Sequence, residues 1–417
     1  MEAPGTGEKL SFETLGLEPR LLQGVAAMGY TIPTPIQTES IPHVLAGRDV
    51  VGCAQTGTGK TAAFVLPLLQ RIEPRKGIQA LVVTPTRELA QQISEVATQA
   101  SKFTGHRSVV IYGGVGYEPQ LQKLRRGVDL VIATPGRLLD IHNRGSINLK
   151  NVKILVLDEA DRMLDMGFWP DVRRIIALLP TERQNLLFSA TMSSDVVRIA
   201  GATLKEPVHI ETSPTTKPAE KIRQAIYPVN QMQKADLLVE LLKGGDLNRV
   251  LVFTRTKHRA DRVHRILEKA GVSAAAIHGD RSQSQRQKAL DGFKRGGTRV
   301  LVATDVVARG IDVDEISHVI NYDMPNTAED YVHRIGRTAR AGAEGSAISF
   351  LAAEETSVLH DIERALGEVL ACEDHHGFEY KERVVPMADR TVNTKSRAVF
   401  SSGVMGRRGG NRRIGRR

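Results

Sequence analysis

Two pairs of short segments recur at one spacing, and this repeat constrains the fold more than any other feature of the chain. Residues 81–86 (Leu-Val-Val-Thr-Pro-Thr) resemble residues 251–256 (Leu-Val-Phe-Thr-Arg-Thr), and residues 131–134 resemble residues 301–304. The two pairs therefore have the same separation along the chain. Two strands that recur at one separation predict two copies of a single domain. Short apolar runs alternate with helical patterns, which is typical of parallel sheets covered by helices on both faces.

The expected strands follow from these apolar runs. In the first copy they are 50–54, 80–84, 108–112, 129–133, 153–157 and 185–188. In the second copy they are 249–254, 273–278, 299–303, 317–321 and 346–351. Ligands of such sheets bind just past the carboxyl ends of the strands, so we expect the functional residues there.

A phosphate-binding loop follows the first expected strand. Residues 54–61 (Ala-Gln-Thr-Gly-Thr-Gly-Lys-Thr) match the pattern G-x-x-x-x-G-K-[ST], with Ala54 at the first glycine position. The order of strand, loop and helix is the context that this motif requires. Backbone N–H groups and the helix N-terminus would hold phosphate, Lys60 would reach the β- and γ-phosphates, and Thr61 would bind Mg²⁺. The expected nucleotide-binding residues of the loop are Thr56, Gly57, Thr58, Gly59, Lys60 and Thr61.

Two carboxylates decide between nucleotide hydrolysis and a chance loop. Asp158 and Glu159 follow the apolar run 153–157. We expect Asp158 to hold Mg²⁺ through water and Glu159 to act as general base for the water that attacks the γ-phosphorus. Either acid alone would also fit a helix N-cap. Together with the phosphate loop, the pair predicts hydrolysis of a nucleoside triphosphate.

The composition of the chain limits the class of binding partner and the cellular compartment that we expect. The 417 residues suffice for two domains, and the net charge of +10 favours a polyanionic partner. Aromatic residues make up only 4% of the chain, so a stacking platform for bases is not expected. Cys53 and Cys372 cannot form a disulfide framework, and we expect Cys53 to pack behind the phosphate loop. Without a signal peptide or a membrane-length apolar run, we expect a soluble cytoplasmic protein.

The two copies are expected to differ in function. No phosphate loop precedes Val250, so the second copy cannot bind a nucleotide as the first does. Residues 211–218 have linker composition. We therefore expect domains at 1–211 and 222–372, a linker at 212–221, and a basic, disordered tail at 373–417.

An ordered set of motifs extends over residues 10–370. Its members are Phe12, Gly29-Tyr30, 33–37, 54–61, 85–89, Gly113-Gly114, 134–137, 158–161, 189–191, Gln283, Arg286, 304–305, 309–312 and 333–340. This set resembles one family, the DEAD-box ATP-dependent RNA helicases. Within that family, residues 161–168 and the short basic tail resemble bacterial RhlE-type members.

The resemblance implies two tandem RecA-like domains, each a parallel sheet flanked by helices, with the nucleotide in the interdomain cleft. It implies an RNA-dependent ATPase that locally unwinds or remodels RNA duplexes and RNA–protein complexes. ATP and Mg²⁺ would be the cofactors, and a monomer would bind single-stranded and duplex RNA largely independently of sequence. The alternative is an ATP-gated RNA clamp or annealing chaperone. A complete catalytic set favours the enzyme: Lys60, Glu159, Arg337 and Arg340.

The resemblance also assigns the nucleotide contacts. Gln37 would pair with adenine N6 and N7, as Gln does on adenine in DNA, and Phe12 would stack on the base. Asp312 would hold the ribose, while Arg337 and Arg340 would reach the γ-phosphate as arginine fingers. Read without the family, Gln37 is a surface amide and Phe12 a core aromatic residue.

Coupling and RNA contacts complete the implied site. His333 and Arg334 would link their helix to Asp161 and the turn that contains Ser189 and Thr191, coupling the domains, and Asp305 would order the neighbouring loop. The expected RNA contacts offer hydroxyls, guanidiniums and glycines, which suit phosphate and sugar and favour RNA over DNA. These residues are Thr86, Arg87, Gly113, Gly114, Thr134, Arg137, Gln283, Arg286, Thr304 and Gly310.

One position departs from the family pattern. Ala339 stands where Gly is frequent between the last two basic residues of the set. A positive φ is costly for Ala, so we expect a right-handed backbone conformation there.

Overall fold

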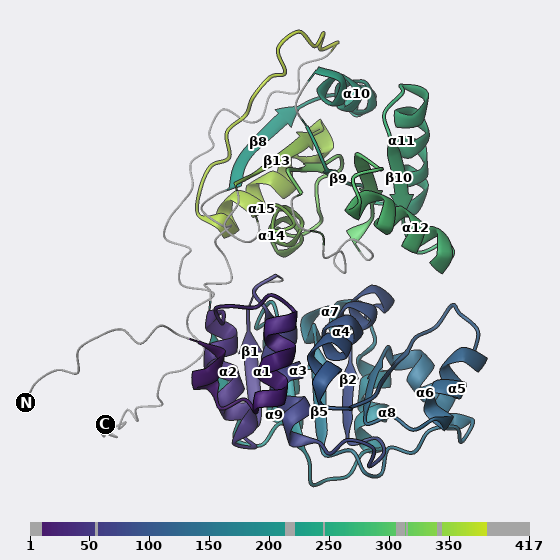
Figure 1. Ribbon diagram of the computed structural model, residues 1–417. Helices are drawn as coiled ribbons and strands as arrows, with labels where there is room; N and C mark the ends of the chain where they lie inside the picture. Colours follow the sequence, from purple (N-terminus) through teal and green to yellow (C-terminus); the bar gives the residue numbers. More distant parts are fainter. Residues whose placement is uncertain are drawn as a thin grey trace, which may run out of the picture.

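The computed structural model forms two α/β domains, one above the other in Figure 1. It describes residues 11–54, 57–212, 222–244, 247–305, 313, 316–339 and 344–381. No helix among these residues has both the length and the apolar composition needed to cross a bilayer. The predicted fold class, two parallel sheets flanked by helices, is confirmed.

The first domain is built on a seven-stranded parallel sheet with the order β3-β4-β2-β5-β6-β1-β7. Its central strands are apolar along their whole length because helices cover both faces. The strands are β1 (Val50–Cys53), β2 (Ala80–Val83), β3 (Ser108–Ile111), β4 (Leu130–Ala133), β5 (Ile154–Asp158), β6 (Gln184–Ser189) and β7 (Val208–Glu211).

Helices of the first domain bury two separate apolar cores against this sheet. One core includes Leu21, Ile36 and Phe64 from α1, α2 and α3, and the other includes Leu138 and Met163 from α6 and α7. The helices are η1 (Phe12–Leu15), α1 (Pro19–Ala27), α2 (Pro35–Leu45), α3 (Lys60–Arg71), α4 (Arg87–Ala100), η2 (Ser101–Phe103), α5 (Glu118–Arg125), α6 (Pro135–Asn143), α7 (Ala160–Asp165), α8 (Trp169–Ala177) and α9 (Ser194–Thr203).

The second domain has a six-stranded parallel sheet with the order β10-β11-β9-β12-β13-β8. Its strands are β8 (Ile222–Pro228), β9 (Val250–Phe253), β10 (Ala274–Ile277), β11 (Val300–Ala303), β12 (His318–Asn321) and β13 (Gly345–Leu351). Its helices are α10 (Lys234–Gly244), α11 (Lys257–Lys269), α12 (Gln283–Lys294), α14 (Ala328–Ile335), η4 (Ala353–Glu355) and α15 (Thr356–Leu366).

The sheet orders confirm the duplication. In the second sheet β9 lies between β11 and β12, just as β2 lies between β4 and β5 in the first sheet. Ala80 pairs with Leu130 in the first sheet, and Val250 pairs with Val300 in the second, so the separation seen in the sequence repeat is kept in the strand register. β8 lies where the first sheet has β1.

Two strands beside the linker, β7 and β8, have no counterpart among the predicted strands. β7 is the edge strand next to β1, with Val50 opposite Val208 and Cys53 opposite Glu211. The backbone N–H of Thr212 then donates to the carbonyl of Cys53 at 3.3 Å. The chain therefore leaves the first domain directly beside the residue that precedes the phosphate loop.

Residues 373–381, which the sequence assigns to the tail, instead pack on the second domain. The N–H of Ile226 donates to Ala371 and the N–H of Glu373 to Ile226, so this segment extends the sheet beside β8, in the place that β7 takes in the first domain. Phe378 and Tyr380 then pack against the core under β8 and α10. These apolar contacts order the segment; the basic tail from residue 382 onward lies outside the described residues.

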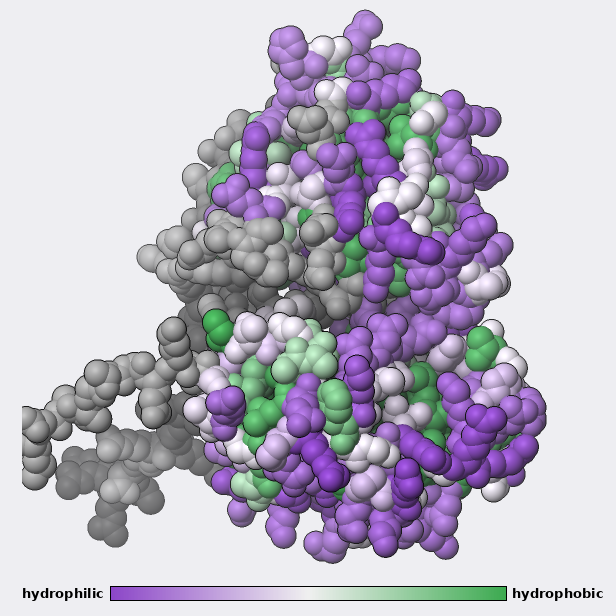
Figure 2. All heavy atoms as spheres, in the orientation of Figure 1, coloured by the Kyte–Doolittle hydropathy of each residue, from purple (hydrophilic) through white to green (hydrophobic). Residues whose placement is uncertain are grey.

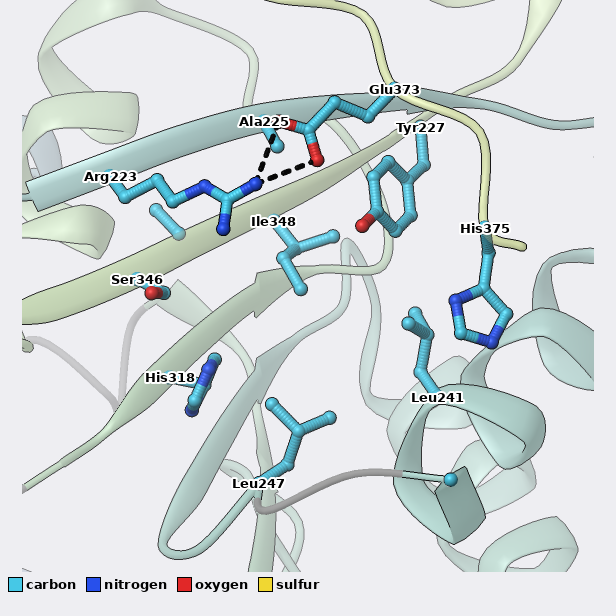
Figure 3. A pocket seen from close by; sticks show the side chains of 12 residues that line it. Arg223, Ala225, Tyr227, Leu241, Leu247, His318, Ser346, Ile348, Glu373 and His375 are labelled. Atoms are coloured by element: carbon cyan, nitrogen blue, oxygen red, sulfur yellow. Dashed lines mark hydrogen bonds and ion pairs between the residues drawn. The ribbon is translucent and has the colours of Figure 1, made fainter.

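A pocket of about 290 Å³ lies between this segment, β8, β13 and α10 (Figure 3). The side chains of Tyr227, Leu241 and Ile348 form its walls, and Arg223 pairs with Glu373 at 3.1 Å at its rim. None of the described residues that we assign to ATP or RNA lines this pocket. The candidate site lies elsewhere, at the carboxyl ends of the strands.

Candidate functional site

The phosphate loop connects β1 to α3 in the predicted way. Gly57 and Gly59 both adopt positive φ, 85° and 91°, which only glycine adopts without strain. A Cβ on Gly59 would also collide with the side-chain amide of Gln37. Lys60 begins α3, and its Nζ donates to the carbonyl of Ala54 at 2.7 Å. Thr61 follows in the same turn, whereas Thr56 lies outside the described residues.

Cys53 lies behind the loop, as predicted. Its thiol is buried and faces the carbonyl of Ala190 at 3.7 Å. Burial, reinforced by the negative charge of Glu211, raises the pKa of the Cys53 thiol to about 11. The thiol therefore stays protonated and acts as a packing group.

The acidic pair ends β5 at the same edge of the sheet. Asp158 is fully buried, and burial together with the charge of Glu159 raises the pKa of its carboxyl to about 7, against the opposing effect of Lys60. Glu159 has φ 52° and ψ 54°, a left-handed conformation that is rare for this residue type. Such strain is found where surrounding contacts hold a functional side chain in place. Here Arg162 provides one of those contacts, at 3.1 Å from Glu159.

Asp161 joins the acidic loop to the turn after β6. Its Oδ2 accepts hydrogen bonds from the backbone N–H groups of Ala190 and Thr191 and from the hydroxyl of Thr191, at 3.0 to 3.2 Å. The hydroxyl of Ser189 accepts a hydrogen bond from the backbone N–H of Asp161 at 3.4 Å. The carbonyl of Ser189 also accepts from the N–H of Ala54, so this turn touches the base of the phosphate loop.

Two side chains of the second domain reach this acidic loop. His333 on α14 and Arg337 just after it line a cavity of about 20 Å³ together with Glu159, Asp161 and Ala190. Arg337 is buried, and its Nε donates to the carbonyl of His333 at 3.3 Å. Two residues that the resemblance assigns to the nucleotide, Asp312 and Arg340, lie outside the described residues.

Arg334 differs from its expected role. Its guanidinium binds Asp305 through two bonds of 2.6 and 2.7 Å and also donates to Asn321 and to the carbonyl of Asp323. All these partners belong to the second domain. The side chain is only 2% exposed, and a buried guanidinium must satisfy its donors locally. Arg334 therefore orders the loop at Asp305, and His333 alone of the two faces the first domain's acidic loop.

Gln37 and Phe12 are both buried in the structure. The Oε1 of Gln37 accepts from the N–H of Thr34 at 2.9 Å, which forms a capping box at the start of α2. Its Nε2 donates to the carbonyl of Gly59 at 3.1 Å, so Gln37 is tied to the phosphate loop and is no surface amide. Phe12 belongs to the first domain's core and stacks on Tyr30, with the ring centroids 6.4 Å apart.

The expected RNA contacts of the first domain share one edge. Thr86 caps α4, and Arg87 follows it beside Gly114, where a Cβ would collide with the guanidinium. Thr134 precedes α6, and Arg137 in its first turn donates to the carbonyl of Val115 at 3.0 Å. Gly113 lies beside Gly114, Thr304 follows β11 in the second domain, and Gly310 lies outside the described residues.

Gln283 and Arg286 contact the first domain itself. Arg286 binds Glu88 at 2.6 Å, and the two side chains are 9% and 3% exposed. Gln283 accepts from Arg87 and donates to Glu88, at 3.4 and 3.5 Å. The N-termini of α4 and α12 thus form an interdomain contact, where Figure 2 shows mainly hydrophilic side chains.

Comparison with known proteins identifies the family. The DEAD/DEAH box helicase family matches residues 34–199, and the helicase conserved C-terminal domain matches residues 233–342. The DEAD-box ATP-dependent RNA helicase CshA of Bacillus cereus is 45% identical over 355 residues, which are 85% of this chain and 68% of CshA. The chain belongs to the DEAD-box ATP-dependent RNA helicases.

Solved structures of DEAD-box helicases have the same two-domain arrangement. Dbp5 of S. cerevisiae bound to RNA and ADP BeF3 gives a TM-score of 0.81 at 34% identity, covering 88% of this chain and 96% of Dbp5. Mss116 bound to ssRNA and UDP-BeF gives 0.82 at 29% identity, covering 90% and 82%. This DEAD-box protein is therefore an RNA-dependent ATPase that unwinds or remodels RNA in an ATP-dependent reaction. The narrower resemblance to RhlE-type members stays a prediction.

One conformational prediction for the helicase is wrong. Ala339 has φ 55°, a left-handed conformation, where we expected a right-handed one. The hydroxyl of Thr338 donates to the carbonyls of Ile316 and Ser317. Gly345 packs so closely against Thr338 that a Cβ there would collide with it. These contacts fix the chain direction at Thr338, and Ala339 accepts the strained conformation that results.

Two residues of the helicase site were not predicted from the sequence. Arg162 lies three positions after Glu159, a spacing that places two side chains on one face of a helix and could have indicated the ion pair. Glu88 lies within the motif 85–89, but its partner Arg286 belongs to the other domain, and no local pattern indicates that contact.

Proposed function

We propose that Lys60, Glu159 and Arg337 hydrolyse ATP in the cleft between the two domains. The observation that carries this proposal is the cavity shared by Glu159 of the first domain and Arg337 of the second. Lys60 would neutralise the β- and γ-phosphates, Glu159 would accept the proton of the attacking water, and Arg337 would stabilise the charge of the transferring phosphoryl group. A carboxylate has about four lone-pair sites, so the bond to Arg162 leaves others for that water.

Mg²⁺ fits the residues at the end of β5. Thr61 would supply a hydroxyl and Asp158 a carboxylate, and a Mg²⁺ site of this kind uses one or two carboxylates together with phosphate oxygens. The raised pKa of Asp158 reflects a buried carboxyl beside a second acid, and a cation would offset both effects. The ion would neutralise charge on the phosphates of ATP.

Gln37 would connect the adenine base to the phosphate loop, because its side chain could contact both. Its Nε2 donates one hydrogen to Gly59, so the second amide hydrogen would remain for adenine N7 while Oε1 accepts from N6. Replacement of Gln37 by Ala should reduce the preference for ATP over GTP more than the maximal rate, as measured by nucleotide competition. For Phe12, a stacking role requires that its buried ring become accessible.

We assign coupling to Asp161, Ser189, Thr191 and His333. The three hydrogen bonds that Asp161 accepts fix the turn after β6, and His333 faces the same cavity. The predicted linker would serve as the hinge of domain closure. RNA phosphates and sugars would bind along the edge that carries Arg87, Gly114 and Arg137, independently of sequence. A cytoplasmic location and a monomeric state stay predictions.

Replacement of Glu159 by Gln tests the assignment of the base. We expect the rate of ATP hydrolysis to fall about 10²-fold or more, since a positioned general base contributes roughly 10²–10⁴. ATP and RNA should still bind, and RNA should dissociate slowly, because opening requires hydrolysis. Single-turnover phosphate release and RNA dissociation rates measure both effects. If RNA dissociated from Glu159→Gln as fast as from the wild type with ATP present, Glu159 would not be the base.

A further inference from the structure

Beyond the assigned RNA contacts, two arginines of the first domain enclose one tyrosine. The guanidinium carbons of Arg137 and Arg144 lie 4.1 and 3.9 Å from the ring centre of Tyr117. One face of a phenol ring cannot hold two guanidiniums at these distances, so they lie on opposite faces. The two charges are consequently separated by little more than the thickness of one ring and its two contacts.

Asp140 holds this stack in place. Its Oδ2 accepts the hydroxyl hydrogen of Tyr117, and its Oδ1 accepts from Nε of Arg144 at 3.3 Å. The hydrogen bond from Tyr117, together with the charges of Arg144 and Arg137, lowers the pKa of Asp140 below its usual range. One carboxylate against two guanidiniums leaves the cluster with one net positive charge. The ring and the carboxylate thus fix two long side chains that would otherwise be mobile.

The cluster continues the proposed RNA edge. Arg137 donates through Nη2 to Val115, while its Nη1 is buried and has no hydrogen-bond partner among the described residues. Arg144 ends α6, and its side chain is 52% exposed. From Arg87 beside Gly114, through Arg137, to Arg144, guanidiniums follow one another along this side of the first domain. In Figure 2 the surface over α5 and α6 is largely hydrophilic.

We propose that Arg144, positioned by Tyr117 and Asp140, binds a phosphate of the RNA strand next to the phosphate that Arg137 binds. This inference rests on the proposed RNA edge, because Arg137 is part of that edge and also part of the cluster around Tyr117. The Nη groups of Arg144 are not used by Asp140, and two guanidiniums on either side of one ring can contact neighbouring phosphates of one strand. Tyr117 cannot stack on a base, since arginines cover both faces of its ring. Recognition at this position is therefore of the backbone alone.

The experiment measures binding of a nested series of uridine oligomers, from the shortest that stimulates ATP hydrolysis upward. Arg144→Ala should bind the shortest oligomer as the wild type does and longer ones roughly fivefold more weakly at low salt, because one exposed charge contact is lost. The slope of log K against log salt should fall by about 0.7 for the longer oligomers. Tyr117→Leu removes the ring that positions both arginines, so it should weaken binding at every length and lower the salt slope for the longer oligomers as Arg144→Ala does. Adding Arg144→Ala to it should change binding of the longer oligomers little, because the positioned Arg144 contact is already lost.

Two further variants separate the possible failures. Arg198→Ala removes an exposed arginine of α9 that pairs with Asp195, and it should bind every oligomer as the wild type does. Arg137→Ala should weaken binding at every length. If Arg137→Ala does so but Arg144→Ala binds all lengths normally, Arg144 does not contact RNA. If neither variant changes binding, the proposed RNA edge itself is wrong. Thermal melting of each variant excludes unfolding as the cause.

Discussion

The two domains share a strand order but use the corresponding strand in different ways. In the first domain, β1 leads into the phosphate loop and then into α3, which begins with Lys60. In the second, β8 takes the place of β1 and leads into α10, which begins with Lys234. Lys60 lies at the loop, whereas Lys234 is completely buried and binds Glu355 at 2.6 Å. The same position thus faces the predicted phosphate loop in one domain and an internal carboxylate in the other.

This difference shows how one duplicated fold acquires two tasks. Glu355 also accepts hydrogen bonds from the N–H groups of Met324 and Ala352 and binds Arg255 at 3.0 Å. Burial lowers the pKa of Lys234, and the charge of Glu355 opposes that effect. Its lysine is used internally, and the second domain instead faces Glu159 through His333 and Arg337, on α14 and just after it.

The largest effect that we expect comes from Arg337 of the second domain. Arg337→Ala should lower the rate of ATP hydrolysis by about 10³-fold, the lower end of the range for arginine fingers, while ATP binding to the first domain is nearly unchanged. Nucleotide affinity and single-turnover hydrolysis measure the two quantities separately. Arg364→Ala, which removes an exposed arginine of α15 paired with Asp361, serves as the control. Equal rates for Arg337→Ala and the wild type would remove the second domain from the chemistry.

Replacement of the two lysines at corresponding positions should affect different properties of the protein. Lys60→Ala should lose nucleotide affinity with little change in thermal stability. Lys234→Ala should lower the free energy of unfolding by about 3–5 kcal/mol, because it leaves the buried Glu355 without its closest cation. Chemical denaturation and nucleotide binding of both variants test this contrast. A stable Lys234→Ala protein would show that Arg255 alone can compensate Glu355.

The contact between Glu88 and Arg286 should affect the interdomain step alone. Glu88→Gln leaves a buried guanidinium without its carboxylate, so we expect RNA-stimulated ATP hydrolysis to fall roughly tenfold and hydrolysis without RNA to change less. Asp195→Asn breaks an exposed ion pair within the first domain and should leave both rates unchanged. If exchange of the two charges in Glu88→Arg/Arg286→Glu restored part of the stimulation, the coupling would be direct.

The last prediction concerns the dependence of stability on pH through Asp158. Because its pKa is raised to about 7, the folded protein binds a proton more tightly there than the unfolded chain does. The free energy of unfolding should therefore fall as the pH rises from about 4 to about 7 and then level off. Asp158→Asn should remove this dependence and stabilise the nucleotide-free protein at pH 8. Equal melting temperatures of the variant and the wild type at pH 8 would contradict the shift.

The parts of the fold that could be predicted are those with a strong local signal. Apolar runs such as 80–84 and 153–157 predicted β2 and β5 with nearly correct ends, because strands buried on both faces are apolar throughout. β7 and β8 were missed because edge strands alternate: Val208–Glu211 includes the polar residues His209 and Glu211. Such short mixed segments resemble loops.

For the site, the sequence could predict groups but not their partners. The loop and the acidic pair lie at one edge of the first sheet because its parallel strands end there, and Arg337 of the second domain lines a cavity with Glu159. The partners of Arg334 and Arg286, and the conformation of Ala339, depend on residues distant in the chain. For the two arginines the reason is burial, because a buried guanidinium must hydrogen-bond to the acceptors nearest to it in the folded protein.

The pairing of β7 with β1 has a mechanical consequence. Thr212 is the first residue of the predicted linker and the last described one before residue 222, and its N–H is bonded to the carbonyl of Cys53. A pull on the chain beyond Thr212 would therefore act as shear on the hydrogen-bond ladder between β7 and β1, whose last residue pair is Cys53 and Glu211. The next residues of β1's chain are those of the phosphate loop. The predicted phosphate loop is thus continuous with the strand that would bear such a pull.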